Sequence, residues 1–416
     1  MVGALAPEGG KIGLYGLNPP ALARLVAHLM SGPFSGRSVL ILAPTALEAE
    51  DLAGDLSFFW PEGLVAPMPG LEGKPFMGQV VSPEAGADRL RALETLAQKG
   101  QSSAVVAPAS ALLRLVPDRT ELGQRTLTVT PGDEVGFDRL KDYLAKGGYN
   151  PVGQVETVAD YSVKGGIVDV FPAGADLPVR LDFFGDVLES IRTFGVEDQR
   201  SVGKLETLTL VPAGEAPRDA ASLEKGAERL AILAEKNGWL WLLWEPLVRR
   251  LKEGLLSADL DDWSPLWSPE KVMALDYLGP ENPVIVIEPA RFRGALEAAY
   301  LNVYNHFSRL AYEERPHLPM PALYATHQNL LDKLLAPGLS LYASVETPIK
   351  GASPLGEGTA LDAEIAFACE TNADLKALAS LPRRETGLLG PLAARVKSLL
   401  GRGLNVSLIL RGQEQL

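Results

Sequence analysis

Cysteine and histidine are scarce in this sequence, and their scarcity excludes several kinds of site. The 416 residues include one cysteine, Cys369, so the chain can form no internal disulfide and no multi-cysteine zinc site. The four histidines lack the close spacing that metal ligands need; they are His28, His306, His317 and His327. We therefore expect no metal site.

Long apolar runs are also missing, and negatively charged residues outnumber positively charged ones. No stretch approaches the roughly 18 apolar residues of a membrane helix, and residues 1–11 lack the pattern of a signal peptide. We therefore expect a cytoplasmic protein with no membrane partner. The 39 Lys and Arg residues face 52 Asp and Glu residues, a net charge of -13 that repels nucleic-acid phosphates. This balance disfavours a stand-alone DNA-binding protein, although a local basic patch stays possible.

Apolar residues make up 46% of the chain, which is typical of globular proteins with sizeable cores. Residues 1–125 alternate short apolar strands with helical patterns, and this alternation predicts a parallel sheet covered by helices. The expected strands are 12–15, 38–42 and 103–107, and the expected helices are 20–30, 46–59 and 85–99.

From residue 126 the pattern changes to short alternating strands separated by turns. This change predicts a small β-rich α+β domain over residues 126–213, with one helix at 138–146. Helices then return, and we expect residues 214–380 to complete the first α/β domain. The elements expected there are buried strands at 239–244 (WLWLLW) and 283–287 and a long helix at 290–309.

The last segment, residues 381–416, has the pattern of a further α/β domain. A helix is expected at 391–400 and an apolar strand at 404–410, with only six residues after it. A parallel strand needs neighbours and a crossover helix to be buried. We therefore expect the chain to stop inside this domain and to be part of something longer.

The junction after the first expected strand stands where a phosphate-binding loop would be expected. Such a loop, GxxxxGK[ST], uses glycines to surround the phosphates, a lysine for their oxygens and a hydroxyl for magnesium. Here Gly16 is followed by two prolines, and Leu22 and Ala23 supply neither lysine nor hydroxyl. We interpret Gly16, Leu22 and Ala23 as a degenerate loop and expect no nucleotide cofactor.

Carboxylates offer a second kind of chemistry, because paired Asp and Glu residues can act as acid and base. Asp182, Asp186 and Glu189 lie close together in the sequence, but Gly185 and Asp186 have the pattern of a two-residue hairpin turn. We expect Asp182 and Glu189 to face water as a solvated strand surface. Glu288 follows an apolar strand without a second carboxylate, so we interpret it as structural. No catalytic residue is predicted.

The expected strand at 178–184 has two distinct sides. Its alternation places Val179, Leu181 and Phe183 on one side and Arg180, Asp182 and Phe184 on the other. The first set is expected to be core. Arginine and aromatic residues are enriched at binding hot spots, so the second set is a candidate binding surface. The alternative, that Phe184 packs under a neighbouring loop, stays open.

Residues 147–200 resemble the second domain of the bacterial transcription-repair coupling factor family, which is similar in form to the excision-repair helicase UvrB. The resemblance rests on GGYNPVGQV, KGGIVDVFP, PVRLDFFGD and a final QR, and it extends more weakly to SPEAGADRLRAL at Ser82. It implies an α/β fold in which a degenerate, helicase-like parallel-sheet domain is interrupted by the β-rich domain.

The resemblance also implies a non-catalytic adaptor that recruits UvrA, the damage-recognition ATPase, to RNA polymerase stalled at DNA lesions. The family's UvrA-contact positions map onto Lys164, Arg180 and Phe184. Lys164 departs from the family's arginine, because lysine keeps the charge but loses the planar fork. RNA polymerase and DNA are expected to be bound only through family domains that this chain lacks.

Two other functions remain as alternatives. The first is a UvrB-like, ATP-dependent protein that remodels damaged DNA despite its unusual nucleotide loop. The second is direct recognition of damaged DNA, which the acidic balance of the chain disfavours.

Overall fold

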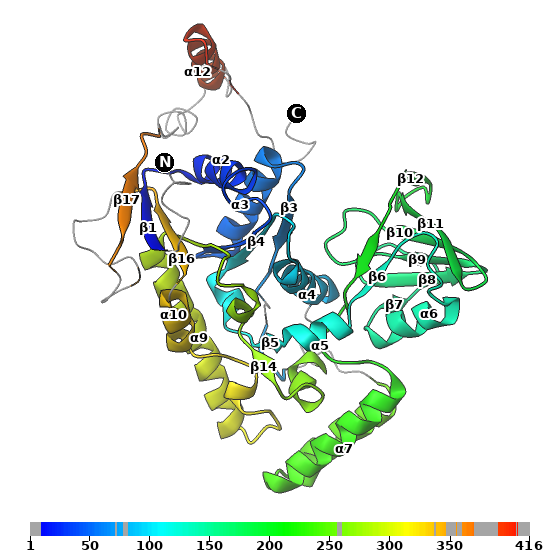
Figure 1. Cartoon of the computed structure of the whole chain (residues 1–416). Helices are drawn as coiled ribbons and strands as arrows, with labels where there is room; N and C mark the ends of the chain where they lie inside the picture. The colour runs from blue at the N-terminus through cyan, green and yellow to red at the C-terminus, as the bar shows by residue number, and fades with distance from the viewer. Residues whose placement is uncertain are drawn as a thin grey trace.

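The computed structural model describes residues 10–70, 73–77, 82–255, 260–336, 338–346, 355, 360–369, 390–404 and 406. A seven-stranded parallel sheet in the order β17-β1-β16-β15-β2-β4-β3 organises the first lobe (Figure 1). Its strands are β1 Gly10–Tyr15, β2 Ser38–Ala43, β3 Leu64–Pro67, β4 Ser103–Pro108, β15 Val284–Ile287, β16 Leu339–Ser344 and β17 Ala363–Ala366.

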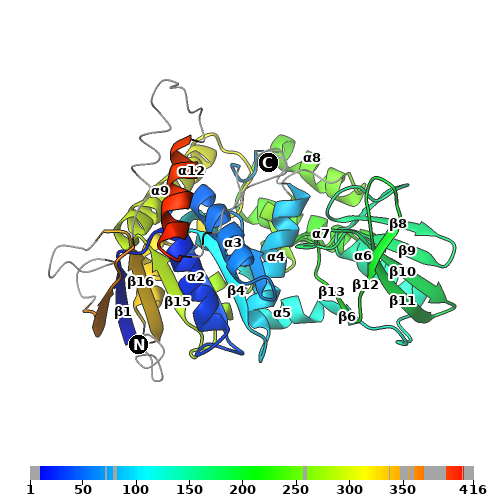
Figure 2. The same ribbon diagram turned by 90° about the horizontal axis from the view of Figure 1, so that it is seen from above.

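Helices cover both faces of this sheet, which is why β2 and β4 are buried along their whole length and appear as unbroken apolar runs. One face packs against α2 Pro19–Met30 and α3 Ala46–Phe59. The other packs against α4 Pro83–Ala97, α9 Pro289–Tyr312 and α10 His327–Leu335. Figure 2 shows the strands between these layers.

The chain leaves this lobe after α5 Arg119–Gln124 and builds a separate β-rich insert, seen on the right in Figures 1 and 2. Strands β6 Leu127–Val129 and β13 Leu208–Leu210 pair antiparallel where the chain enters and leaves the insert. Between them lies a six-stranded sheet in the order β12-β11-β10-β9-β8-β7. Its elements are β7 Asn150–Pro151, β8 Asp160–Lys164, β9 Ile167–Val170, β10 Val179–Phe184, β11 Val187–Phe194, β12 Ser201–Lys204 and the helix α6 Phe137–Lys146.

A third group of elements follows the insert and forms its own apolar cluster around Leu230, Leu251, Trp263 and Phe307. It contains the helical hairpin α7 Ala220–Lys236 and α8 Trp241–Lys252, whose helices pack against each other. The short strand β14 Lys271–Val272 pairs with β5 Val116–Pro117 and ties this group to the first lobe. The 3₁₀ turns are η1 Ala109–Leu112, η2 Leu260–Leu266, η3 Ala274–Tyr277 and η4 Met320–Ala322.

The expected fold class is confirmed: a parallel-sheet α/β domain is interrupted by a small β-rich domain. The expected strand at 239–244 is wrong, because Gly238, with φ of 66°, reverses the chain and α8 begins at Trp241. The helix expected at 391–400 is present as α12 Gly390–Gly401. The strand expected at 404–410 lies outside the described residues except for positions 404 and 406. Within the described part of the chain, no helix is long and apolar enough to cross a membrane.

Candidate functional site

Two neighbouring hairpins of the insert end at the same edge of its sheet. In the first, Lys164 pairs with Ile167 across a turn that Gly165 makes at φ of 62°. In the second, Phe184 pairs with Val187 across the turn Gly185–Asp186, as the sequence predicted. The amide of Phe183 donates to the carbonyl of Gly166 at 2.8 Å, so the two turns lie side by side.

These turns expose apolar side chains and a cation at one edge of the sheet; we call this group the hairpin tip and define it as Val163, Lys164, Phe184 and Val187. All four side chains are exposed, and Phe184 is 77% exposed. Its neighbour Phe183 points to the other side and packs edge-on against Phe137 at 5.4 Å between ring centroids. The phenyl ring of Phe184 therefore does not pack under a loop.

Arg180 lies farther along β10 and is held within the sheet. Its guanidinium makes a two-point contact with Asp169 on β9, with Nε to Oδ1 at 2.7 Å and Nη2 to Oδ2 at 2.8 Å. It also lies 4.7 Å from the ring centroid of Phe194, and its side chain is 21% exposed. Hydrogen bonding to Asp169 raises the pKa of Arg180. Arg180 is thus a fixed, partly buried cation rather than a free surface group.

The carboxylates near this strand are each engaged with a different partner. Asp182 Oδ2 accepts from Ser190 Oγ at 2.5 Å and from Arg192 Nη2 at 2.6 Å, so the prediction that Asp182 simply faces water is wrong. Asp186 Oδ1 accepts from the amide of Phe137 at 3.1 Å, at the start of α6. Glu189 is exposed, as predicted. The contacts of Asp182 and Asp186 are structural.

A row of polar residues crosses one face of this sheet from strand to strand. In the strand register its members are successive partners: Ser162, Asp169, Arg180, Arg192 and Lys204. Cations outnumber carboxylates in this row, although the chain as a whole carries a net charge of -13. The sequence alone did not reveal Asp169 and Arg192, because their place depends on the strand register.

The loop between β1 and α2 has the geometry of a capped helix start. Asn18 Oδ1 accepts from the amide of Ala21 at 3.0 Å, and the two residues between them are prolines, which have no amide hydrogen. Leu22 and Ala23, at the lysine and hydroxyl positions of a phosphate loop, are both buried. Of the backbone amides that would surround a phosphate, that of Ala21 therefore already donates to Asn18, and the two prolines have none.

Gly16, at the start of this loop, packs closely against the backbone of Phe367. It adopts φ of 77°, and a Cβ placed there would lie 2.2 Å from the carbonyl oxygen of Phe367. Glu288, the other candidate for magnesium chemistry, accepts from the amide of Val345 at 2.8 Å, which fits a structural role. Among the described residues, no group of three or more Asp, Glu, His or Cys side chains is arranged to hold a metal ion.

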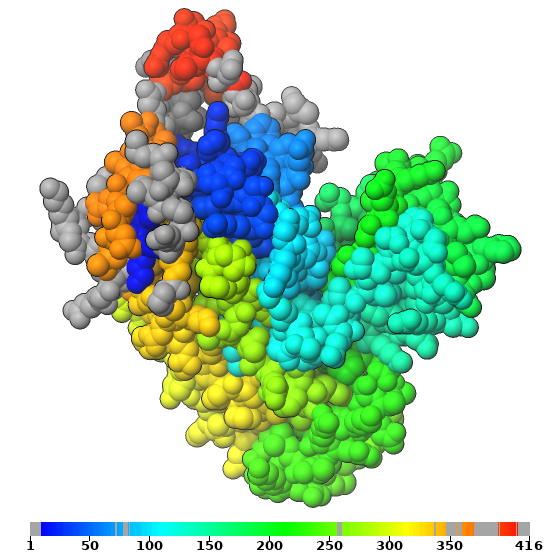
Figure 3. Space-filling model, viewed as in Figure 1, coloured from blue at the N-terminus to red at the C-terminus, as the bar shows by residue number. Residues whose placement is uncertain are grey.

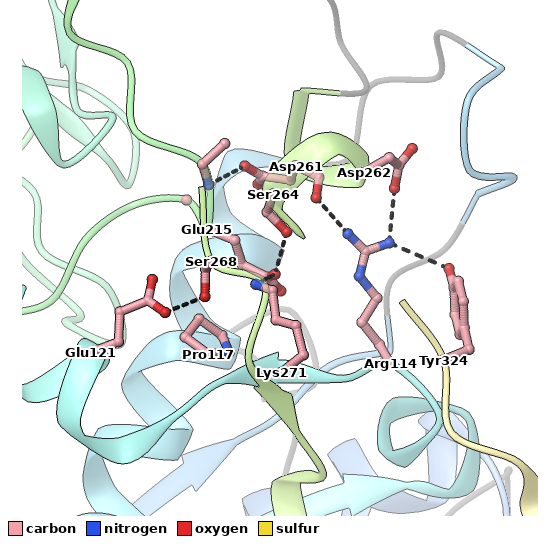
Figure 4. A network of polar contacts seen from close by, with 12 residues as sticks. Arg114, Pro117, Glu121, Glu215, Asp261, Asp262, Ser264, Ser268, Lys271 and Tyr324 are labelled. Carbon is pink, nitrogen blue, oxygen red and sulfur yellow. Dashed lines mark hydrogen bonds and ion pairs between the residues drawn. The ribbon is translucent and has the colours of Figure 1, made fainter. Parts of the chain in front are cut away.

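A buried network of charges lies where the insert rejoins the rest of the chain (Figure 4). Glu215 accepts from Lys271 Nζ at 2.9 Å and from Ser264 Oγ at 3.0 Å. Beside it, Arg114 contacts Asp262 at 2.8 Å. Burial alone would raise the pKa of Glu215, but Lys271 and Arg114 lower it to about 2.

The same network fixes the backbone of the segment that leaves the insert. Asp261 Oδ1 accepts from the amide of Ala216 at 2.9 Å. Arg125 donates to the carbonyl oxygens of Gly214 and Glu215, both at 2.8 Å. No sequence pattern marks this junction, because Glu215 and Lys271 are far apart in the chain and neither lies in a recognisable motif.

Comparison with known proteins matches residues 127–215 to a family described as the UvrB interaction domain. The chain is 29% identical over 288 residues to the transcription-repair-coupling factor of Escherichia coli (strain K12), covering 68% of this chain and 24% of that protein. It is 32% identical over 299 residues to that of Mycobacterium bovis, with the same coverage of 68% and 24%.

A third similarity is to the transcription-repair-coupling factor of Haemophilus influenzae, 33% identical over 201 residues, covering 48% of this chain and 17% of that protein. The matched part of the chain thus spans about a quarter or less of the length of these relatives. The resemblance inferred from the sequence is confirmed.

Proposed function

From the match of residues 127–215 to the UvrB interaction domain and the similarity of the chain to transcription-repair-coupling factors, we propose that it is the N-terminal, UvrB-like module of such a factor. It acts in the cytoplasm as a non-catalytic adaptor of transcription-coupled nucleotide excision repair. Its partner is UvrA, which it recruits to RNA polymerase stalled at a lesion. Contacts with the polymerase and with DNA belong to other parts of the full-length protein.

The proposal divides the chain into 1–125 and 214–380, which form the UvrB-like α/β domain, 126–213, which docks UvrA, and 381–416, which starts a further domain. The single observation that carries it is the exposure of Phe184 on the hairpin tip, at the same edge of the sheet as the cation of Lys164. A large exposed aromatic side chain next to a cation is the kind of anchor that dominates binding energy at interfaces.

Arg180 contributes to the same docking face in a different way. Because Asp169 and Phe194 already hold its guanidinium, UvrA would order little of this side chain on binding, which lowers the entropic cost of the contact. Arg192 and Lys204 extend the positive row beyond it. The docking surface of UvrA is therefore expected to be acidic with an apolar recess for the phenyl ring.

The test is a titration of the purified chain into UvrA, followed by calorimetry. Truncating Phe184 to alanine should weaken binding about tenfold or more, as expected for an interface hot spot. Phe58→Ala is the matched control, because Phe58 is 48% exposed on α3, in the first lobe and outside the insert. This control should bind like the wild type.

Two further variants test the charged contacts. Lys164→Arg should strengthen binding, since the planar fork can make two hydrogen bonds to a carboxylate where lysine acts as a point charge. Arg180→Lys keeps the charge but loses the two-point contact with Asp169, and it should weaken binding without removing the carboxylate's partner. Unchanged affinity in both Phe184→Ala and Arg180→Lys would refute the assignment of this face.

The non-catalytic part of the proposal is supported by the capped loop at Asn18 and by the burial of Leu22 and Ala23. We expect calorimetric titration with ATP and magnesium to give no binding tighter than about 1 mM. Tighter binding would favour the alternative, a UvrB-like protein that remodels damaged DNA with ATP.

A further inference from the structure

An open cavity of about 770 Å³ lies at the carboxyl ends of β3 and β4 in the first lobe. Pro67 and Pro108, the last residues of these strands, line it, and so do the first turns of α3 and α4. Parallel α/β sheets bind ligands outside the carboxyl ends of their strands, and cavities of roughly 300–1,000 Å³ hold small molecules. Strands β16, β15 and β2 separate this cavity from β1 and the degenerate loop at Gly16.

The lining of the cavity combines buried apolar side chains with exposed polar ones. Met68 and Leu113 line it and are buried. Ser110, in η1, and Asn302, on α9, line it and are exposed. An apolar surface with a few hydrogen-bonding groups is the usual composition of a small-molecule site. A flat apolar ligand can therefore lie against Met68 and Leu113 while its polar group reaches the hydroxyl or the amide.

Two buried arginines lie at one wall of the cavity. Arg114 lines it, and its guanidinium contacts Asp262 at 2.8 Å (Figure 4). Arg89 is 2% exposed, and its Nη1 donates to the carbonyl oxygens of Pro69, which lines the cavity, and of Ala111. Among the described residues, Nε and Nη2 of Arg89 have no hydrogen-bond partner. This wall thus contains a buried cation whose hydrogen bonds go to neutral carbonyl groups, and such a charge attracts an anion.

Carboxylates on α3 and α4 limit the negative charge that the cavity accepts. Asp88, on α4, lines the cavity and accepts from the amide of Gly174 in the insert at 3.0 Å. Figure 3 shows α4 at the surface between the first lobe and the insert. Glu50, on α3, lines the cavity and is exposed. These two carboxylates repel a ligand with several negative charges, such as a nucleoside triphosphate, and leave room for one anionic group at the wall of Arg114.

We propose that this cavity binds a small organic monoanion with a flat apolar body, such as an aromatic carboxylate. Its ring lies against Met68 and Leu113, and its anionic group lies at the wall of Arg114. The hydroxyl groups of Ser110 and Tyr324 line the cavity and donate to it. The Tyr324 hydroxyl accepts from Arg114 Nη1 at 3.4 Å, so its own hydrogen is available for the ligand.

Fluorescence titration with anilinonaphthalene sulfonate tests the site, because this probe is an aromatic monoanion whose emission rises in apolar surroundings. The full chain should bind it saturably, with a dissociation constant of about 10 to 100 µM. Asn302→Trp should weaken binding about tenfold or more, because the indole fills part of the cavity from an exposed position. Asn305→Trp is the matched control, because Asn305 is exposed on the same helix outside the lining, and it should bind like the wild type.

Displacement of the probe tests the charge of the ligand. Naphthoate and naphthamide share one ring system and differ in a single charge, so naphthoate should displace the probe at about fivefold or more lower concentration. Ser110→Asp should remove this preference, because it adds a negative charge to the lining. Ser110→Asn is the neutral control and should keep the preference.

Binding at other apolar surfaces is separated by Leu242→Glu, because Leu242 is 78% exposed on α8, and this variant should bind the probe like the wild type. The proposal is overturned by a wild type without saturable binding, by unchanged binding in Asn302→Trp, or by loss of binding in Leu242→Glu. Equal displacement by naphthoate and naphthamide, or a preference that survives Ser110→Asp, would also overturn it. Phe184→Ala should bind the probe like the wild type, which separates this result from the test of the docking face.

Discussion

Replacing Glu215 with glutamine should destabilise the junction between the insert and the first lobe. The substitution keeps the shape of the side chain and an acceptor for Ser264 Oγ, but it removes the charge that faces Lys271. The side chain of Lys271 is only 2% exposed, so its ammonium group cannot turn to water for compensation. Breaking a buried ion pair by neutralising one partner is costly for this reason.

The size of the effect follows from the lowered pKa of Glu215. Burial raises this pKa, but Lys271 and Arg114 together lower it from 4.5 to about 2. At about 1.4 kcal/mol per pH unit, this difference corresponds to about 3 kcal/mol of folding free energy. Because the pKa is lower in the folded than in the unfolded chain, this stability is present above pH 4.5 and is lost as the pH falls toward 2.

Urea unfolding followed by tryptophan fluorescence measures the loss, since the buried Trp263 lies in the cluster beside this network. We expect the free energy of unfolding of Glu215→Gln to be about 3 kcal/mol lower than that of the wild type at pH 7. This difference in unfolding free energy should shrink near pH 3. Glu313→Gln is the control, because its pair with Arg309 is screened by solvent, and no measurable change is expected. Equal urea midpoints for Glu215→Gln and this control at pH 7 would refute the reasoning.

Three further variants test other parts of the structure. Gly226→Ala should lower the melting temperature despite alanine's better helix propensity, because its Cβ would lie 2.1 Å from the ring of Trp267. Asp169→Asn should weaken UvrA binding in calorimetry, although Asp169 is buried, because Arg180 loses the carboxylate that positions it. Leu22→Lys should lower the melting temperature by burying an ammonium group and should gain no thermal shift with MgATP.

Each of these variants has a matched control. Gly123→Ala adds a Cβ to a helical glycine with no atom within 4 Å and should not lower the melting temperature. Asp176→Asn changes an exposed carboxylate of the insert and should leave UvrA binding intact. Leu47→Lys places the new charge on the surface of α3 and should fold like the wild type. A variant that behaves like its control would contradict the corresponding prediction.

The parallel-sheet lobe could be predicted well because its strands are buried on both faces. Such strands appear as short unbroken apolar runs, and β2 and β4 were expected within one residue of their ends. The helix α3 has the limits that were expected, since Thr45 caps it by accepting from the amide of Glu48 at 3.3 Å. The local sequence is sufficient to predict the limits of these elements.

The stretch at 239–244 shows where local chemistry fails. A run of tryptophan and leucine is compatible with a buried strand or with a helix, and periodicity cannot separate the two in so few residues. The tertiary structure decides, because Trp244 and Leu247 pack on the cluster around Trp263 at helical spacing while Leu242 stays outside. The exposure of these side chains could not be foreseen from an apolar run.

The geometry of the proposed docking face could be predicted in part for a related reason. Strand alternation correctly separated Phe184 from the core, and the fixed geometry of a hairpin turn keeps the ring exposed. The ion pair between Arg180 and Asp169 depends instead on how β9 and β10 align. The junction at Glu215 brings together residues from distant parts of the chain, and no local pattern marks them.

We expect folding stability and partner binding to depend on different residues of this chain. Phe184 is 77% exposed, so removing its ring takes little packing away from the insert. Glu215 lies at the junction and outside the hairpin tip, so its loss weakens the attachment of the insert without changing the contact surface. A Phe184 variant that melts like the wild type but fails to bind UvrA therefore isolates the contact. A Glu215 variant that binds weakly would instead show that the insert must be held in place to dock.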